Sequence, residues 1–284
     1  QIPPEVAERV SELRIAGLFQ NREYRRYYPG GEVMAQVLGF TGADDAGQEG
    51  VELAFQSTLA GKSGSRRVIK DRLGQIVEDT QSIREAQNGR DLVLALDAKL
   101  QNLAFSQLKL AVDGNKAKAG AIVVLDAKTG EVLALANLPT YNPNNRNRLS
   151  GAQLRNRVIT DTFEPGSTLK PFTVALAMEL GKITPESMIA TAAGSLTIGK
   201  ATIRDAHRFG DMTVAQVIQR SSNVGAAKIA LSLPAEAMWG MFDKVGFGSA
   251  PRLGFPGAAG GKLRAYKSWR PIEQATMAYG HGIS

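Results

Sequence analysis

The spacing of hydrophobic positions predicts two regions, of which the first is irregular. Its expected helices and strands are all short: helices over residues 5–13 and 50–59, and strands over residues 66–70 and 75–78. Asp71-Arg72-Leu73-Gly74 separates the two strands and predicts a hairpin turn. The polar segment 81–89 ends in the turn-forming pair Asn88-Gly89. We therefore place a domain boundary there and assign residues 1–88 to the first domain.

From residue 89 onward the pattern is more regular and predicts helices around an antiparallel sheet. Hydrophobic and polar residues alternate over positions 90–96, as in a strand, and Asp97 can cap the helix that follows. The apolar face of that helix is expected to contain Leu100, Leu103, Ala104, Leu108 and Ala111. The other expected elements are a hairpin and four helices: strands over 121–125 and 132–136, and helices over 167–180, 213–220, 224–232 and 272–278. The pattern thus predicts an α+β fold with a second domain over residues 89–284.

The composition is that of an ordinary globular protein and excludes several classes. Hydrophobic residues make up 43% of the 284 positions and charged residues 21%, and no apolar run approaches the length of a membrane span. The absence of cysteine excludes disulfides, thiolate metal sites and cysteine nucleophiles. The net charge of +7 comes from scattered residues, which favours a solvated surface over a nucleic-acid site. Gly61-Lys62-Ser63 is no phosphate loop, because Gln56 stands where that motif needs glycine.

A serine and a lysine three residues apart are the first candidates for chemistry. Ser167 and Lys170 would share one face of a helix at this spacing. A serine hydroxyl becomes a good nucleophile when a neighbour takes its proton, and a lysine can do so if partial burial lowers its pKa. Pro171 is tolerated only in a first helical turn, so the helix should start near Gly166 or Ser167. The Ser167 N–H would then lie at the positive helix end, where it can stabilise an oxyanion.

A second polar pattern follows about fifty residues later. Ser221 and Asn223 form an S-x-N motif between two helix-like segments, where serine and asparagine favour a turn. Either pattern alone is common among proteins. Their occurrence together, in this order, predicts an active site in which the two motifs meet.

With these motifs, the chain resembles a class B penicillin-binding protein of the cell-division (septal) type, a peptidoglycan D,D-transpeptidase. S-x-x-K is a motif of penicillin-binding proteins and class A β-lactamases. The resemblance covers nearly the whole chain through these segments: Arg25-Arg26-Tyr27-Tyr28-Pro29, Gly47-Gln48-Glu49-Gly50-Val51-Glu52, Thr129-Gly130-Glu131-Val132-Leu133-Ala134, Tyr141-Asn142-Pro143-Asn144-Asn145 and Phe163-Glu164-Pro165-Gly166-Ser167-Thr168-Leu169-Lys170-Pro171. It implies an N-terminal non-catalytic pedestal domain followed by a penicillin-binding transpeptidase domain.

The resemblance also implies the roles of four catalytic residues, with no metal or organic cofactor. Ser167 would attack the D-Ala–D-Ala carbonyl of a peptide stem, and Lys170 would act as general base. Ser221 would relay a proton to the leaving amine. Asn223 would hold Lys170 in place and bond the substrate amide. An amine from a neighbouring stem would then resolve the acyl-enzyme and form the cross-link.

The chain departs from the family pattern in two places. The family's third motif, Lys-Ser/Thr-Gly, follows the other two, whereas Lys128-Thr129-Gly130 precedes both and is expected to be a hairpin turn. If the polypeptide ends at Ser284, the C-terminal part of the transpeptidase domain is missing, and we expect such a chain to be inactive. His281 stands where the family commonly has tyrosine. Neither His207 nor His281 has an obvious acidic partner, and there is no G-x-S-x-G elbow, which disfavours a histidine base.

The implied partners and location complete the hypothesis. Peptidoglycan stem peptides and their lipid-linked precursor would be substrates, and β-lactam antibiotics would acylate the same serine. Division-complex membrane proteins, including a glycosyltransferase, would be partners, at the periplasmic face of the bacterial inner membrane, with an N-terminal transmembrane anchor that this chain does not contain. The alternatives are a D,D-carboxypeptidase or β-lactamase of the same chemistry, and a non-catalytic β-lactam sensor or division scaffold with the same fold.

Overall fold

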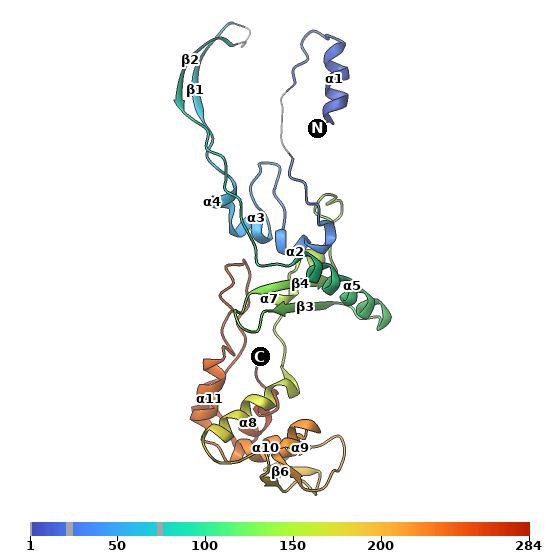
Figure 1. Cartoon of the computed structure of the whole chain (residues 1–284), viewed down its shortest axis with the longest axis vertical. Helices are drawn as coiled ribbons and strands as arrows, with labels where there is room; N and C mark the ends of the chain where they lie inside the picture. The colour runs from blue at the N-terminus through green and yellow to red at the C-terminus, as the bar shows by residue number, and fades with distance from the viewer. Residues whose placement is uncertain (1, 21–24, 73–75) are drawn as a thin grey trace.

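The chain is elongated, and its two predicted regions lie toward opposite ends (Figure 1). The computed structural model describes residues 2–20, 25–72 and 76–284. Helix α1 (Pro4–Glu12) and a hairpin of β1 (Ser65–Lys70) and β2 (Ile76–Arg84) extend from one end. Within the described ranges, no helix has the length and apolar character needed to span a bilayer.

The N-terminal region consists of short elements, as predicted. Between α1 and the hairpin they are η1 (Gly31–Val33), α2 (Ala35–Leu38), α3 (Gly50–Ala54) and α4 (Gln56–Leu59). The helix predicted over residues 50–59 is divided into α3 and α4 at Phe55. β1 and β2 pair antiparallel, and β2 continues to Arg84, six residues beyond the predicted end at residue 78. Part of the predicted turn and second strand, residues 73–75, lies outside the described residues.

The middle of the molecule is a helix packed on a two-stranded sheet. α5 (Ala98–Gly114) covers the antiparallel pair β3 (Gly120–Leu125) and β4 (Val132–Leu138), and Asp97 caps α5 as predicted by accepting from the N–H groups of Lys99 and Leu100. Buried Phe105 and Leu108 pack against Ala134 and Ala136 of the sheet.

The predicted apolar face of α5 is wrong at Leu103, which is 56% exposed, and at Ala111, which is also exposed. The fully buried polar residue Gln101 lies on the covered face instead. Its amide nitrogen donates to the carbonyl oxygens of Val33 and Leu135, and its amide oxygen accepts from the Leu135 N–H. A buried polar side chain is tolerated where its hydrogen bonds are satisfied, and a hydrophobicity pattern does not register that.

The strand predicted over residues 90–96 is wrong, because these residues have no ladder partner within the described chain. Their burial does alternate: Leu92, Leu94 and Leu96 pack against a buried cluster that includes Val51 and Leu135. Alternation along a sequence reports which side chains are covered, whereas a strand also needs a neighbour to pair with.

The far end of the molecule is helical. Its helical elements are η2 (Gly166–Leu169), α8 (Lys170–Glu179), α9 (Val214–Gln219), α10 (Asn223–Leu231), α11 (Ala235–Lys244), η3 (Tyr266–Ser268) and α12 (Pro271–Met277). The short helices α6 (Gly151–Leu154) and α7 (Arg157–Thr160) precede them, and α7 packs against β3 and β4 in the middle of the molecule. Two small ribbons join β5 (Met188–Ile189) to β8 (Met212–Thr213) and β6 (Ser195–Ile198) to β7 (Ala201–Arg204). Buried Leu169, Val217, Ala226 and Phe242 share one core. This core fixes η2 and α8 relative to the turn between α9 and α10.

Candidate active site

The predicted site residues lie where helices begin and end. Ser167 is in η2, and Lys170 is the first residue of α8, with Pro171 in the first turn as predicted. Ser221 lies in the turn between α9 and α10, and Asn223 begins α10. The predicted helix start near Gly166 is confirmed, although its first turn has 3₁₀ geometry, which is common at helix ends.

Three of the four residues form a closed triangle of hydrogen bonds. The Lys170 Nζ donates to Ser167 Oγ at 3.0 Å and to Ser221 Oγ at 2.8 Å. The Ser221 hydroxyl donates to Ser167 Oγ at 3.0 Å. Lys170 also donates to the Ser221 carbonyl oxygen at 2.6 Å. The serine hydroxyl therefore lies within proton-transfer distance of two polar groups, as an activated nucleophile requires.

The surroundings of Lys170 favour its neutral form. Burial lowers the pKa of Lys170 from 10.5 to about 8, while the carboxylate of Asp205 opposes the shift. The residue is only 1% exposed, so water cannot solvate its ammonium form well. Its place in the first turn of α8 acts in the same direction, because the positive end of the helix disfavours a cation. A substantial fraction of Lys170 is therefore neutral near pH 8.

The backbone at Ser221 has a conformation that normally favours glycine. Ser221 has φ 55°, and it follows the last residues of α9. Its N–H donates to Ile218 O, and the Ser222 N–H donates to Val217 O. These two bonds make the Schellman motif, whose left-handed position is usually glycine. A serine here costs about 1 kcal/mol relative to glycine, and it places a hydroxyl beside Ser167 and Lys170.

Asp205 holds the S-x-N turn and was not found by the sequence analysis. One carboxylate oxygen accepts from the N–H groups of Asn223 and Val224 at 2.6 and 2.9 Å, and the other accepts from Ser222 Oγ at 2.7 Å. Ser222 in turn accepts from the Gly225 N–H. Asp205 and Ser222 thus satisfy the free N–H groups at the start of α10. Asp205 lies seventeen residues before Ser222 in the sequence, so no local motif marks the contact.

Asn223 lies in the same turn but outside the triangle. Its side-chain amide donates to Arg204 O at 3.3 Å. The hydrogen bonds of the described residues do not join Asn223 to Lys170, which is the contact that the family resemblance implies.

The segment before Ser167 is tied to the segment around His281. Glu164 accepts from the Gly282 N–H at 2.8 Å and pairs with His281 Nδ1 at 2.9 Å. The Gly166 N–H donates to Gly280 O, and a Cβ on Gly280 would lie 2.2 Å from Gly166 O, so only glycine fits there. The expectation that His281 has no acidic partner is wrong. The two residues are 117 positions apart, a separation that sequence patterns do not bridge.

Two other polar features are separate from this triangle. Lys128-Thr129-Gly130 forms the turn between β3 and β4, as predicted, with the Lys128 and Thr129 N–H groups donating to Asp126.

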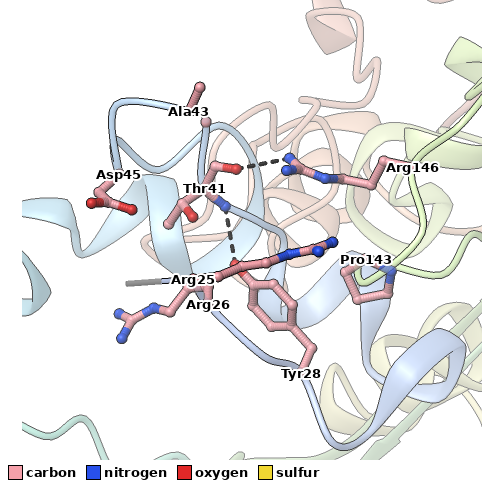
Figure 2. Close-up of a pocket in the computed structure, with 9 residues that line it drawn as sticks. Arg25, Arg26, Tyr28, Thr41, Ala43, Asp45, Pro143 and Arg146 are labelled. Carbon is pink, nitrogen blue, oxygen red and sulfur yellow. Dashed lines mark hydrogen bonds between the residues drawn. The ribbon is translucent and has the colours of Figure 1, made fainter. Parts of the chain in front are cut away.

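A pocket lined by Arg25, Arg26 and Arg146 contains none of the four site residues (Figure 2). Across the described ranges, His, Asp and Glu do not form any group of three or more suited to a metal ion.

Comparison with known proteins places both regions in one family. Residues 120–284 match the penicillin-binding protein transpeptidase domain, and residues 1–94 match the penicillin-binding protein dimerisation domain. A probable peptidoglycan D,D-transpeptidase PenA of Neisseria gonorrhoeae is 44% identical over 285 residues, which cover 100% of this chain and 49% of PenA. Peptidoglycan D,D-transpeptidase FtsI of Escherichia coli strain K12 is 41% identical, with 100% of this chain and 48% of FtsI covered.

Solved structures give the same result. A crystal structure of penicillin-binding protein 3 from Mycobacterium tuberculosis matches 91% of this chain and 55% of that chain, with a TM-score of 0.80 and 32% sequence identity. The chain spans about half the length of the curated relatives that it matches. Since the transpeptidase model alone covers more than half of the chain, the chain belongs to the penicillin-binding protein transpeptidase family.

Proposed function

We propose that the protein to which this chain belongs is a peptidoglycan D,D-transpeptidase that cross-links peptide stems through a serine acyl-enzyme during septal wall synthesis. The observation that carries the proposal is the triangle of Ser167, Lys170 and Ser221. PenA and FtsI, which are similar to the whole chain, are named for this activity. β-Lactams are the proposed inhibitors, in keeping with the family's description as penicillin-binding.

In the proposed acylation step, Ser167 Oγ attacks the carbonyl carbon of the D-Ala–D-Ala bond. Neutral Lys170 removes the hydroxyl proton across 3.0 Å, and the pKa of about 8 makes this possible near neutral pH. Ser221 bonds to both groups and relays a proton to the nitrogen of the departing D-alanine. The C–N bond breaks, and the stem remains as an ester on Ser167. The Ser167 N–H, in the first turn of η2, stabilises the oxyanion.

In the second step, the amine of a neighbouring stem attacks the ester carbonyl. Lys170 accepts a proton from that amine, and the proton returns to Ser167 Oγ when the ester bond breaks. The products are a new amide cross-link and the free enzyme. Asn223 is proposed to bond the substrate amide, because its side chain is in the same turn as Ser221.

We further propose that residues 1–88 are part of the non-catalytic pedestal domain and residues 89–284 part of the transpeptidase domain. The match of residues 1–94 to the dimerisation domain supports the first assignment. Stem peptides and their lipid-linked precursor are the proposed substrates, and division-complex membrane proteins including a glycosyltransferase are the proposed partners. The relatives' role in peptidoglycan supports a place in the bacterial envelope. The periplasmic face of the inner membrane, with an N-terminal anchor, is the specific location proposed.

The test is the intact mass of the full-length protein before and after incubation with benzylpenicillin. We expect one stoichiometric adduct that maps to Ser167. Ser167→Ala should abolish the adduct, whereas Thr168→Ala, which removes the adjacent hydroxyl, should retain it. An adduct that persists in Ser167→Ala would refute the assignment. Release of D-alanine from a stem pentapeptide, with and without an acceptor amine, then separates transpeptidation from hydrolysis.

A further inference from the structure

A pocket of about 310 Å³ lies where three segments of the chain meet, apart from the proposed active site (Figure 2). Its walls come from three segments: Arg25, Arg26 and Tyr28; Thr41, Gly42, Ala43 and Asp45; and Pro143 and Arg146. The first two segments lie in the part of the chain that matches the dimerisation domain, and the third lies in the part that matches the transpeptidase domain. An occupant would therefore contact both parts at once.

Three guanidinium groups line this pocket, and one of them is already neutralised. Arg26 forms a two-pronged ion pair with Glu52, with its Nε and a terminal nitrogen 2.9 and 3.2 Å from the two carboxylate oxygens. Arg25 and Arg146 differ from Arg26 in their partners. Among the residues that the structure describes, neither forms an ion pair with a carboxylate, and each donates one hydrogen bond to a backbone carbonyl: Arg25 to Asn144 at 2.9 Å and Arg146 to Thr41 at 2.7 Å.

The guanidinium of Arg146, which forms no ion pair with a described residue, is positioned by its contacts with Thr41 and Phe40. It lies over the ring of Phe40, 4.5 Å from the centroid, and Phe40 packs edge-on against buried Tyr141. The same Thr41 whose carbonyl accepts from Arg146 donates its N–H to the Tyr28 hydroxyl at 3.0 Å. Most of the ordering that a ligand would require of Arg146 is therefore already present in the free protein, and pre-ordering favours binding.

We propose that this pocket binds the carboxylate of an acidic side chain in a peptide segment of a partner protein. An arginine has five N–H donors in a fixed fork that matches a carboxylate, and one hydrogen bond to a carbonyl leaves donors of Arg25 and Arg146 free. The Tyr28 ring, Ala43 and Pro143 provide apolar surface for the methylene groups of a glutamate.

The charge of the pocket favours a carboxylate over a phosphate. Asp45 also lines it, and this carboxylate repels anions in proportion to their charge. A phosphate near its second ionisation carries up to two charges, whereas a carboxylate carries one. With Arg26 neutralised by Glu52, Arg25 and Arg146 leave the pocket only moderately positive against Asp45.

The test is the binding of a fluorescein-labelled peptide, Gly-Ser-Glu-Glu-Ser-Gly, to the full-length protein, followed by fluorescence anisotropy at low and high salt. A peptide with glutamine in place of both glutamates is the ligand control. We expect Arg25→Gln and Arg146→Gln each to weaken binding about tenfold or more, as the loss of charge-assisted hydrogen bonds implies. Arg252→Gln makes the same charge change at an exposed position outside the pocket and should stay within about twofold.

Each outcome decides the proposal. Weaker binding of the acidic peptide by the two pocket variants, with unchanged binding by Arg252→Gln, supports the proposal. Three results would overturn it: an equal loss of affinity in Arg252→Gln, equal binding of the glutamine peptide, or no binding of the acidic peptide at millimolar concentration. Displacement by inorganic phosphate at lower concentrations than by free glutamate would also overturn it and identify a phosphate site. If Arg146→Gln unfolds in a thermal melt, exposed Arg25→Gln decides the result alone.

Discussion

At the scale of single residues, the proposed chemistry depends on the pH at which Lys170 loses its proton. Its pKa of about 8 means that the fraction of neutral base rises with pH and reaches half there. We expect the rate of acylation by a chromogenic β-lactam to rise about tenfold per pH unit below that value and to level off above it. An unperturbed lysine would produce no plateau below pH 9. Lys170→Arg, which keeps the charge but cannot act as a base, should lose activity at every pH.

Glu164 allows a second test at this scale, because its two oxygens hold two different groups near Ser167. Glutamine in its place keeps an acceptor oxygen for the Gly282 N–H but turns an N–H₂ group toward the His281 ring, so a ring N–H there loses its carboxylate acceptor. We expect Glu164→Gln to slow acylation about three- to tenfold, the loss of one hydrogen bond. The thermal midpoint should hardly move, since His281 and Glu164 are 64% and 51% exposed. A large fall in the midpoint with an unchanged rate would mean that the pair is structural.

At the scale of elements, the turn between α9 and α10 combines a strained backbone with the Ser221 hydroxyl, for which we propose a role in proton transfer. Ser221→Gly should relax the left-handed residue and raise the free energy of unfolding by about 1 kcal/mol. The same change should lower the acylation rate about a hundredfold or more, because the proton relay is lost. Ser221→Ala is the matched control, since it loses the hydroxyl and keeps the strain. Urea denaturation and acylation kinetics measure the two effects, and equal stability of the two variants would contradict the strain.

These elements show which parts of the fold could be predicted from the sequence alone. The start of α8 was predictable from Pro171, and the cap of α5 from Asp97, because both are local rules of backbone bonding. The unpaired segment 90–96 was not, because pairing depends on a partner distant in sequence. The site likewise divides into residues that local motifs reveal and residues that only folding brings together. Local motifs predicted Ser167, Lys170 and Ser221, whereas Asp205 is brought to the site by the folding of the β6–β7 ribbon beside α10.

At the scale of the whole molecule, buried polar side chains join the N-terminal segments to the central sheet. Gln101 is fully buried and bonds both Val33 O and the backbone of Leu135. Tyr141 makes a second link, since its buried hydroxyl donates to Ala35 O. These contacts cross from the first region to the second, so they set how rigidly the two regions move together.

Removal of the first link tests this coupling. Gln101→Met keeps the volume but leaves two carbonyls and one N–H without their partner, and we expect a loss of about 2–4 kcal/mol in the free energy of unfolding. Asn102→Met alters the adjacent exposed amide, which donates to Ala98 O within its own helix, and should cost less than about 1 kcal/mol. Urea denaturation measures the free energy of unfolding of the two variants, and hydrogen exchange measures the protection of individual amides. If the links couple the regions, amides of α2 should exchange faster in Gln101→Met, and unchanged exchange there would show that the N-terminal segments are held independently of Gln101.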